Sequence, residues 1–193
     1  GECLNCKVIS LFPIPDIPTI SKHYKFLNKE NEKNISNEKI LPLLFKIKDY
    51  YQNKKSIKNI LRNILKFGEE DFPYLNRLCG RKILDLGSGN GFFSLAAKEK
   101  GFEVISIEQN KSSINFANRI GVKMIASDIN SKISMKYASE VDNITLNHVF
   151  EHILKPYNFL SILRKNISNH TKVIIFIPNA NSIWRYIFKE RWY

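Results

Sequence analysis

Short apolar runs alternate with longer amphipathic stretches over the second half of the chain. The apolar runs predict five buried strands, near 82–86, 103–107, 122–126, 142–147 and 172–177. The stretches between and after them predict helices near 91–100, 111–120, 148–154 and 157–167. Strands that alternate with helices in this way are typical of an α/β fold with a doubly wound, mostly parallel sheet.

The first half of the chain has a different pattern. Residues 28–39 are rich in Asn, Lys and Glu without an apolar period, which indicates an exposed loop. Apolar residues then recur at helical spacing between Ile57 and Leu65, as in a helix that packs on a sheet. We therefore expect residues 28–80 to form a linker and cap helices.

A glycine-rich turn joins the first predicted strand to the first predicted helix. Gly87, Gly89 and Gly91 occupy every second position, and backbone without a Cβ can come close to a ligand. A dinucleotide site would place its third glycine where Phe92 stands. Asp85, near the end of the strand, favours a ligand with a positively charged amino group rather than a pyrophosphate.

Glu108 ends the next apolar run, Val104 to Ile107. An acidic side chain at that position can accept hydrogen bonds from both hydroxyls of a ribose. The two carboxylates and the glycine turn together favour a site for an amino-acid-bearing nucleoside.

The pattern Asp-x-Gly-x-Gly-x-Gly followed by an acidic residue resembles the class I S-adenosylmethionine-dependent methyltransferases, over about Arg81 to Asn179. The resemblance implies a Rossmann-like sheet, S-adenosylmethionine as the cofactor and methyl transfer as the activity. For each acidic residue an ordinary turn or loop carboxylate is the alternative. The implied cofactor-binding residues are Asp85, Gly87, Ser88, Gly89, Gly91, Glu108, Gln109, Asp128, Ile129 and Asn147.

The segment after the fourth strand, Asn147 to Ile153, resembles the His-x-x-Glu-His segment of small-molecule methyltransferases of the ubiquinone O-methyltransferase type. It makes His148, Glu151 and His152 the catalytic candidates, with a histidine as general base for a hydroxyl acceptor. A structural helix start and metal binding are the alternatives. The segment lacks the Asn/Asp-Pro-Pro-aromatic turn of adenine and glutamine N-methyltransferases, and no cysteine follows a strand as a C5-pyrimidine enzyme requires.

Cys3 and Cys6 have the spacing of half a zinc site. With the prolines and His23 that follow, they resemble the tail of the zinc ribbon that precedes some methyltransferases of sugars and other small molecules. Two bystander thiols are the alternative. The expected organisation is thus a zinc-ribbon remnant in 1–27, the linker and caps in 28–80, and a cofactor-binding domain in 81–193 that lacks the last two strands of the full fold.

The net charge of +12 has two explanations. A surface for a polyanion is one, and a lysine- and asparagine-rich composition typical of an AT-rich genome is the other. The three cysteines fit a reduced, cytoplasmic setting, and no apolar run is long enough to span a membrane. We therefore expect methyl transfer to a sugar, quinone or similar small molecule. The alternatives are an RNA or protein methyltransferase and a non-catalytic methyltransferase-like module.

Overall fold

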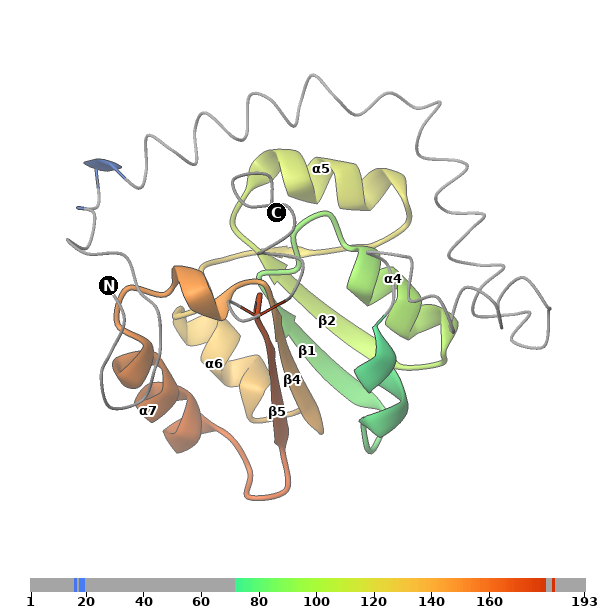
Figure 1. Ribbon diagram of the computed structural model, residues 1–193. Helices are drawn as coiled ribbons and strands as arrows, with labels where there is room; N and C mark the ends of the chain where they lie inside the picture. The colour runs from blue at the N-terminus through green and yellow to red at the C-terminus, as the bar shows by residue number, and fades with distance from the viewer. Residues whose placement is uncertain (1–15, 17, 20–71, 180–181, 183–193) are drawn as a thin grey trace. The chain divides into compact units, whose positions relative to one another are not determined.

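The computed structural model describes residues 16, 18–19, 72–179 and 182 (Figure 1). The chain divides into two compact units, Asn37–Ile177 and a second made of Gly1–Ser36 with Pro178–Tyr193. In the second unit the backbone N–H of Thr19 donates to Asp16 Oδ1 at 2.9 Å. Cys3, Cys6 and most of the predicted linker and caps lie outside the described residues, so the zinc site and the division into three segments stay predictions.

The larger unit contains a five-stranded parallel sheet in the order β3-β2-β1-β4-β5 (Figure 1). The order reverses between β1 and β4, which is where ligands of doubly wound sheets bind. This architecture confirms the predicted fold class. The strands are β1 (Lys82–Leu86), β2 (Glu103–Glu108), β3 (Ile125–Ala126), β4 (Asn143–Asn147) and β5 (Lys172–Phe176).

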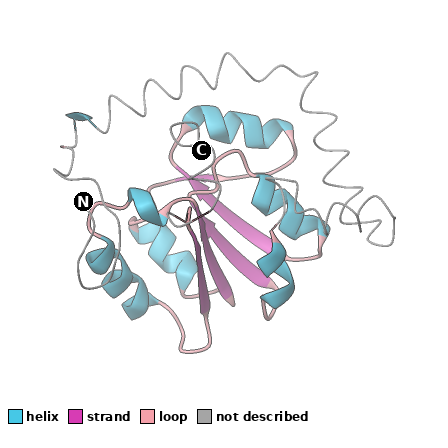
Figure 2. Cartoon of the chain, viewed as in Figure 1, coloured by secondary structure: helices cyan, strands magenta, loops and turns pink. Residues whose placement is uncertain are grey.

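Helices cover both faces of this sheet (Figure 2). The core on one face joins Leu84 and Leu86 of β1 to Met135 of α6 and Phe159 of α7. Side chains alternate along a strand, so Asp85 points to the opposite face, toward α4. The helical elements are η1 (Pro73–Arg77), α4 (Phe92–Glu99), α5 (Lys111–Arg119), α6 (Lys132–Ala138), η2 (Phe150–His152) and α7 (Pro156–Asn166).

Three predictions of local structure were wrong. Helix α6 was not expected at all, although Ser131 caps it by accepting the N–H of Ser134 at 3.0 Å. Strand β3 is shorter than predicted because the N–H of Val122 closes the end of α5 on Ala117 O. The helix expected over 148–154 is a single 3₁₀ turn, since His148 has a φ of +53° and redirects the chain.

None of the helices in the described part of the chain combines the length and the apolar character that crossing a bilayer requires.

Candidate functional site

The predicted cofactor residues gather at the carboxyl ends of three neighbouring strands. Asp85 lies one residue before the end of β1, Glu108 ends β2 and Asn147 ends β4. The register places Asp85 beside Ser106 of β2 and Thr145 of β4. Since β1 and β4 flank the point of strand-order reversal, these polar groups meet where the topology predicts a ligand site.

Asp85 is the centre of a buried polar network. Its side chain is 1% exposed. Ser94 Oγ donates to Oδ2 at 2.8 Å, and Thr145 Oγ1 and Asn147 Nδ2 donate to Oδ1 at 2.9 and 3.3 Å. Burial raises the pKa of Asp85, and the hydrogen bonds offset this only in part. The result is a buried carboxylate whose hydrogen-bond partners are all neutral.

The network reaches the site surface through Asn147, which is only half-buried. The hydroxyl of Tyr74, in η1, donates to Asn147 Oδ1. Tyr74 was not among the predicted site residues, because no local pattern connects side chains 73 positions apart in the chain. Asp85 therefore does not face an open cleft in this conformation; Asn147 and Tyr74 lie between it and the surface.

The glycines of the turn are needed for different reasons. A Cβ on Gly87 would lie 2.6 Å from Val149 Cγ2, and one on Gly91 would lie 2.9 Å from Met124 Cε and 3.2 Å from Ala117 Cβ. A Cβ on Gly89 would have no heavy atom within 4 Å. Gly87 and Gly91 thus permit packing within the protein, and Gly89 is the position where the turn is open to a ligand.

Glu108 faces this turn. Its Oε2 accepts the N–H of Gly89 at 2.9 Å, and its Oε1 accepts the N–H groups of Gln109 and Asn110, each at 2.8 Å. An ionised carboxylate offers about four lone-pair directions, so one on Oε2 is left for a further donor. The Gln109 side chain is exposed.

Ser88 fastens the turn to both strands. Its hydroxyl donates to the carbonyl of Asp85 at 2.8 Å, and its N–H donates to the carbonyl of Ile107 at 3.0 Å. The N–H of Gly87 donates to the same carbonyl at 2.9 Å. These bonds fix the backbone of the turn beside Glu108.

Asp128 and Ile129 follow β3, and both have a local structural role. Asp128 Oδ1 accepts the N–H of Asn130 at 2.7 Å, and the Asp128 carbonyl accepts the hydroxyl of Ser134 at 2.6 Å. Ile129 is half-buried against the core below α6 and α7. Contact of either residue with an adenine ring stays a prediction.

His148 has the one positive φ among the described residues other than glycine. A left-handed backbone at such a residue costs about 1–2 kcal/mol and concentrates at functional sites. Its N–H is held by the carbonyl of Phe176 at 2.9 Å, and its ring meets the Phe176 ring edge-on at 5.2 Å between centroids. It stands between Asn147, which contacts Asp85, and Val149, which packs on Gly87.

Glu151 lies close to His148, with Oε1 at 3.6 Å from Nδ1. Glu151 and His152 are exposed on η2. Over the described residues no three or more His, Cys, Asp or Glu side chains are grouped to hold a metal ion. The structure thus brings His148 and Glu151 together at the site's edge.

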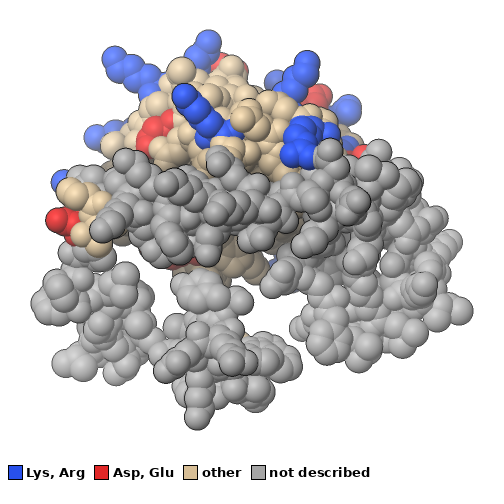
Figure 3. Space-filling view, turned by 90° about the horizontal axis from the view of Figure 1, so that it is seen from above, with Lys and Arg blue, Asp and Glu red and all other residues tan. Residues whose placement is uncertain are grey.

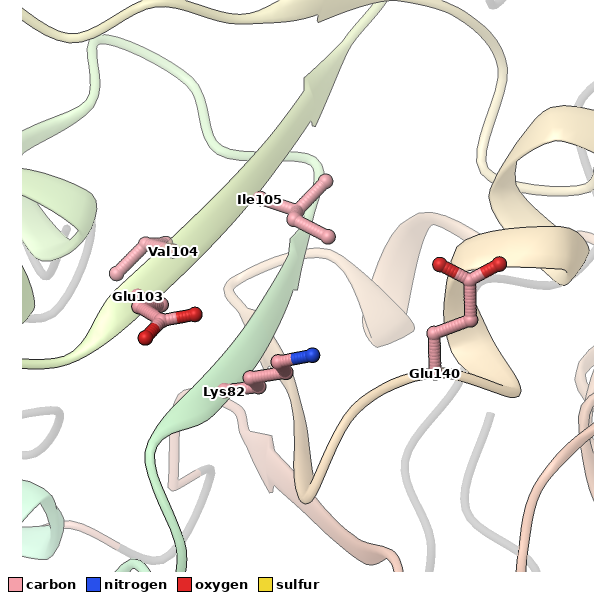
Figure 4. A pocket seen from close by; sticks show the side chains of 5 residues that line it. All are labelled: Lys82, Glu103, Val104, Ile105 and Glu140. Carbon is pink, nitrogen blue, oxygen red and sulfur yellow. The ribbon is translucent and has the colours of Figure 1, made fainter.

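A cavity of about 200 Å³ lies away from these groups (Figure 4). It lies at the amino-terminal ends of the strands, where β1 and β2 begin and the chain enters β4. Its position excludes it from the site described above. The residues that line it are Lys82, Glu103, Val104, Ile105 and Glu140.

Comparison with known proteins identifies relatives of this chain. The family described as "Methyltransferase domain" matches residues 79–184. A 23S rRNA (uracil(747)-C(5))-methyltransferase of Pyrococcus abyssi is 31% identical over 103 residues, which are 53% of this chain and 21% of that protein. The chain therefore spans about a fifth of the length of this curated relative.

Two solved structures share the fold. A SAM-dependent methyltransferase from Archaeoglobus fulgidus has a TM-score of 0.50 and 22% identity, and the match covers 74% of this chain and 62% of that one. The PH0226 protein of Pyrococcus horikoshii OT3 has a TM-score of 0.51 and 20% identity, with 75% and 66% covered.

These matches confirm the Rossmann-like methyltransferase fold that the glycine turn and the two acidic residues predicted. A specific relation to ubiquinone or sugar methyltransferases is not shown by them and stays a prediction. Because the family match extends over more than half of the sequence, this chain belongs to the methyltransferase domain family.

Proposed function

We propose that the protein transfers the methyl group of S-adenosylmethionine to a small-molecule acceptor, and that the cofactor binds where β1, β2 and β4 end. The observation that supports this most is that two carboxylates adjoin the glycine turn: Asp85 lies two residues before it in β1, and Glu108 accepts the N–H of Gly89 within it. Asp85 is a buried carboxyl group with only neutral partners, which in its ionised form fits the ammonium end of the cofactor. Glu108 keeps a free lone pair beside Gly89, which fits a ribose hydroxyl.

Each group would act in its own way. Asp85 is covered, so it would attract the ammonium through the amide of Asn147 and fix that amide's orientation. Glu108 would accept from the ribose directly, while Ser88 holds the turn in place. When bound, the cofactor supplies a methyl group on a cationic sulfur, so alignment of the acceptor is the protein's main contribution.

His148 is the proposed proton acceptor for a hydroxyl on the small molecule. It is exposed, belongs to the strand end that carries Asn147, and has Glu151 near its Nδ1. A carboxylate at Nδ1 favours the tautomer in which Nε2 is free to take a proton. His152 lies on the following turn and is the second candidate.

An RNA acceptor is the alternative, favoured by the rRNA methyltransferase among the relatives and by the net charge of +12. Two observations favour the small molecule. Among the described residues the only cysteine is Cys79, whose backbone bonds to Asn143 at the start of β4, away from the strand ends that form the site and from the place of a C5-pyrimidine nucleophile. Where described residues are visible in Figure 3, their Lys and Arg side chains are scattered among other residues rather than gathered in one patch. Tight polynucleotide binding that weakens steeply with salt would favour RNA instead.

The proposal is tested by calorimetric titration with S-adenosylhomocysteine, the product form of the cofactor, and with NAD⁺ as a comparison ligand. We expect saturable binding of S-adenosylhomocysteine at one site and none of NAD⁺, since Phe92 stands where a dinucleotide site needs glycine. Folded protein that binds neither ligand would contradict the proposal and support a non-catalytic module.

Replacing glycines of the turn separates ligand binding from packing. Both Gly89→Ala and Gly91→Ala place alanine at positive φ, at +53° and +81°, which costs about 1–2 kcal/mol in the free energy of unfolding. Gly91→Ala also brings its methyl group to 2.9 Å from Met124 Cε, 3.2 Å from Ala117 Cβ and 3.3 Å from Val122 Cγ1, and we expect a further loss of about 1–3 kcal/mol. Only Gly89→Ala puts its methyl group into open space, so it should weaken S-adenosylhomocysteine about tenfold.

Urea unfolding and calorimetry on the same two variants check this prediction. Equal loss of stability in both variants would mean that the packing around Gly91 gives way easily. Unchanged ligand affinity in Gly89→Ala would mean that the ligand does not approach the turn there.

A further inference from the structure

We propose that Tyr74 is a positioning residue of this site, whose hydroxyl orients the side-chain amide of Asn147 toward Asp85. The proposal rests on the proposed function, because its purpose is to prepare the cofactor's ammonium end. Tyr74 lies in η1, ahead of the first strand, outside every motif recognised in the sequence.

The ring of Tyr74 is held by aromatic neighbours from separate elements. It stacks on Phe93 of α4 with 5.7 Å between centroids and an interplanar angle of 24°. Its centroid also lies 6.0 Å from that of Phe176 in β5 and 6.3 Å from that of Phe72. Aromatic pairs at these separations are favourable, so the ring's position does not depend on the hydroxyl. The hydroxyl is thereby presented to Asn147 by a fixed support.

The side-chain amide of Asn147 has two possible orientations, and the Tyr74 hydroxyl favours one of them. An asparagine side chain has an oxygen that accepts and an NH₂ that donates, and the two ends exchange when the amide turns over. Ionised Asp85 only accepts, so it needs the NH₂ end, which it receives from Nδ2 at 3.3 Å. Tyr74 donates to the oxygen end. Both partners therefore require one and the same orientation of the amide.

This orientation needs support because the Asn147 bond is the weakest that Asp85 receives. At 3.3 Å it is longer than the bonds from Ser94 at 2.8 Å and Thr145 at 2.9 Å. A reversed amide would turn its oxygen toward the Asp85 carboxylate and its NH₂ toward the site. Such an NH₂ group would repel an incoming ammonium, whereas the oxygen can accept from it.

The test is Tyr74→Phe, which removes the hydroxyl and keeps the aromatic packing. We expect S-adenosylhomocysteine to bind about five- to tenfold more weakly, with the midpoint of urea unfolding nearly unchanged. Tyr137→Phe is the matched control, since Tyr137 packs on the core of the opposite face. This control should leave the affinity as it is.

A double-mutant cycle separates positioning from general loss of packing. Asn147→Ala should weaken binding by itself, and Tyr74→Phe should add nothing in that background. The side-chain NH₂ resonances of Asn147 should shift in Tyr74→Phe and stay in place in Tyr137→Phe. Wild-type protein that fails to bind S-adenosylhomocysteine overturns the proposed function. Wild-type binding with unchanged affinity in Tyr74→Phe, or additive effects in the cycle, overturns this inference alone.

Discussion

Asp85→Asn is expected to weaken the binding of S-adenosylhomocysteine by about 10- to 100-fold without loss of the fold at neutral pH. The substitution removes a buried negative charge that we propose attracts the ligand's ammonium group. Asparagine has nearly the same shape, and its Oδ1 can still accept from Thr145 and Asn147. Calorimetry at neutral pH measures the affinity.

The stability of this variant should depend on pH in a definite direction. Burial raises the pKa of Asp85 above its ordinary value of 3.8, so the folded state holds the proton more tightly than the unfolded state. The resulting stabilisation is complete below the unfolded pKa and is lost as the pH rises through the folded pKa. Asparagine does not titrate. As the pH is raised, the wild type should therefore lose stability that Asp85→Asn does not lose. The difference in free energy of unfolding between the two should shift in favour of Asp85→Asn.

Asp142→Asn is the matched control, because the pKa of Asp142 is shifted in the opposite direction from that of Asp85. The backbone N–H groups of Lys82 and Arg81 donate to the Asp142 carboxylate, at 2.9 and 2.7 Å, and hold its pKa below the ordinary value. Its stabilisation is present above the unfolded pKa and is lost as the pH falls through the folded pKa. Asp142→Asn should therefore be less stable than wild type at neutral pH and bind the ligand normally.

Urea unfolding between about pH 2 and about pH 8 compares the three proteins. An Asp85→Asn variant that is much less stable than wild type at neutral pH would contradict the prediction, because Asp85 would then be a structural anion. Unchanged affinity in Asp85→Asn would separate this carboxylate from the proposed ligand.

The sheet could be predicted from the sequence because its signals are local. Strand β1 has the predicted bounds, and β2, β4 and β5 differ from the prediction by one residue. Helix α6 was missed since its seven residues are too few to show a helical period, although Ser131 is a typical N-cap. The error at 148–154 has another cause. The backbone of His148 is fixed by Phe176 in a neighbouring strand, and Pro156 starts a separate helix.

Only those residues of the candidate site that belong to sequence motifs could be predicted. The glycine turn and Glu108 were identified because they follow predicted strands. The burial of Asp85 was not predicted, since it depends on Ser94 of α4 and Thr145 of β4. Tyr74 gave no signal, because its role follows from contacts with α4, β4 and β5. Side-chain contacts between distant segments are set by packing, and a single sequence carries no pattern for them.

Glu108→Ala is expected to weaken S-adenosylhomocysteine by about 10- to 100-fold, and to lower stability modestly. The carboxylate accepts three backbone N–H groups, from Gly89, Gln109 and Asn110, and its loss leaves them to water. Loss of affinity alone would therefore not distinguish a ribose contact from a loosened turn. Glu103→Ala, at the other end of β2, is the control for loss of an exposed carboxylate from the same strand.

A pair of ligands makes that distinction. Adenosine and 2′,3′-dideoxyadenosine differ only in the two ribose hydroxyls, one of which Glu108 is proposed to bind. Wild-type protein should prefer adenosine by about tenfold or more, since the dideoxy ligand leaves the carboxylate unpaired. Glu108→Ala should bind both ligands nearly equally, because the proposed partner of the ribose is then gone. If the preference for adenosine survives in Glu108→Ala, the carboxylate acts only by holding the turn, and the ribose must be bound elsewhere in the site.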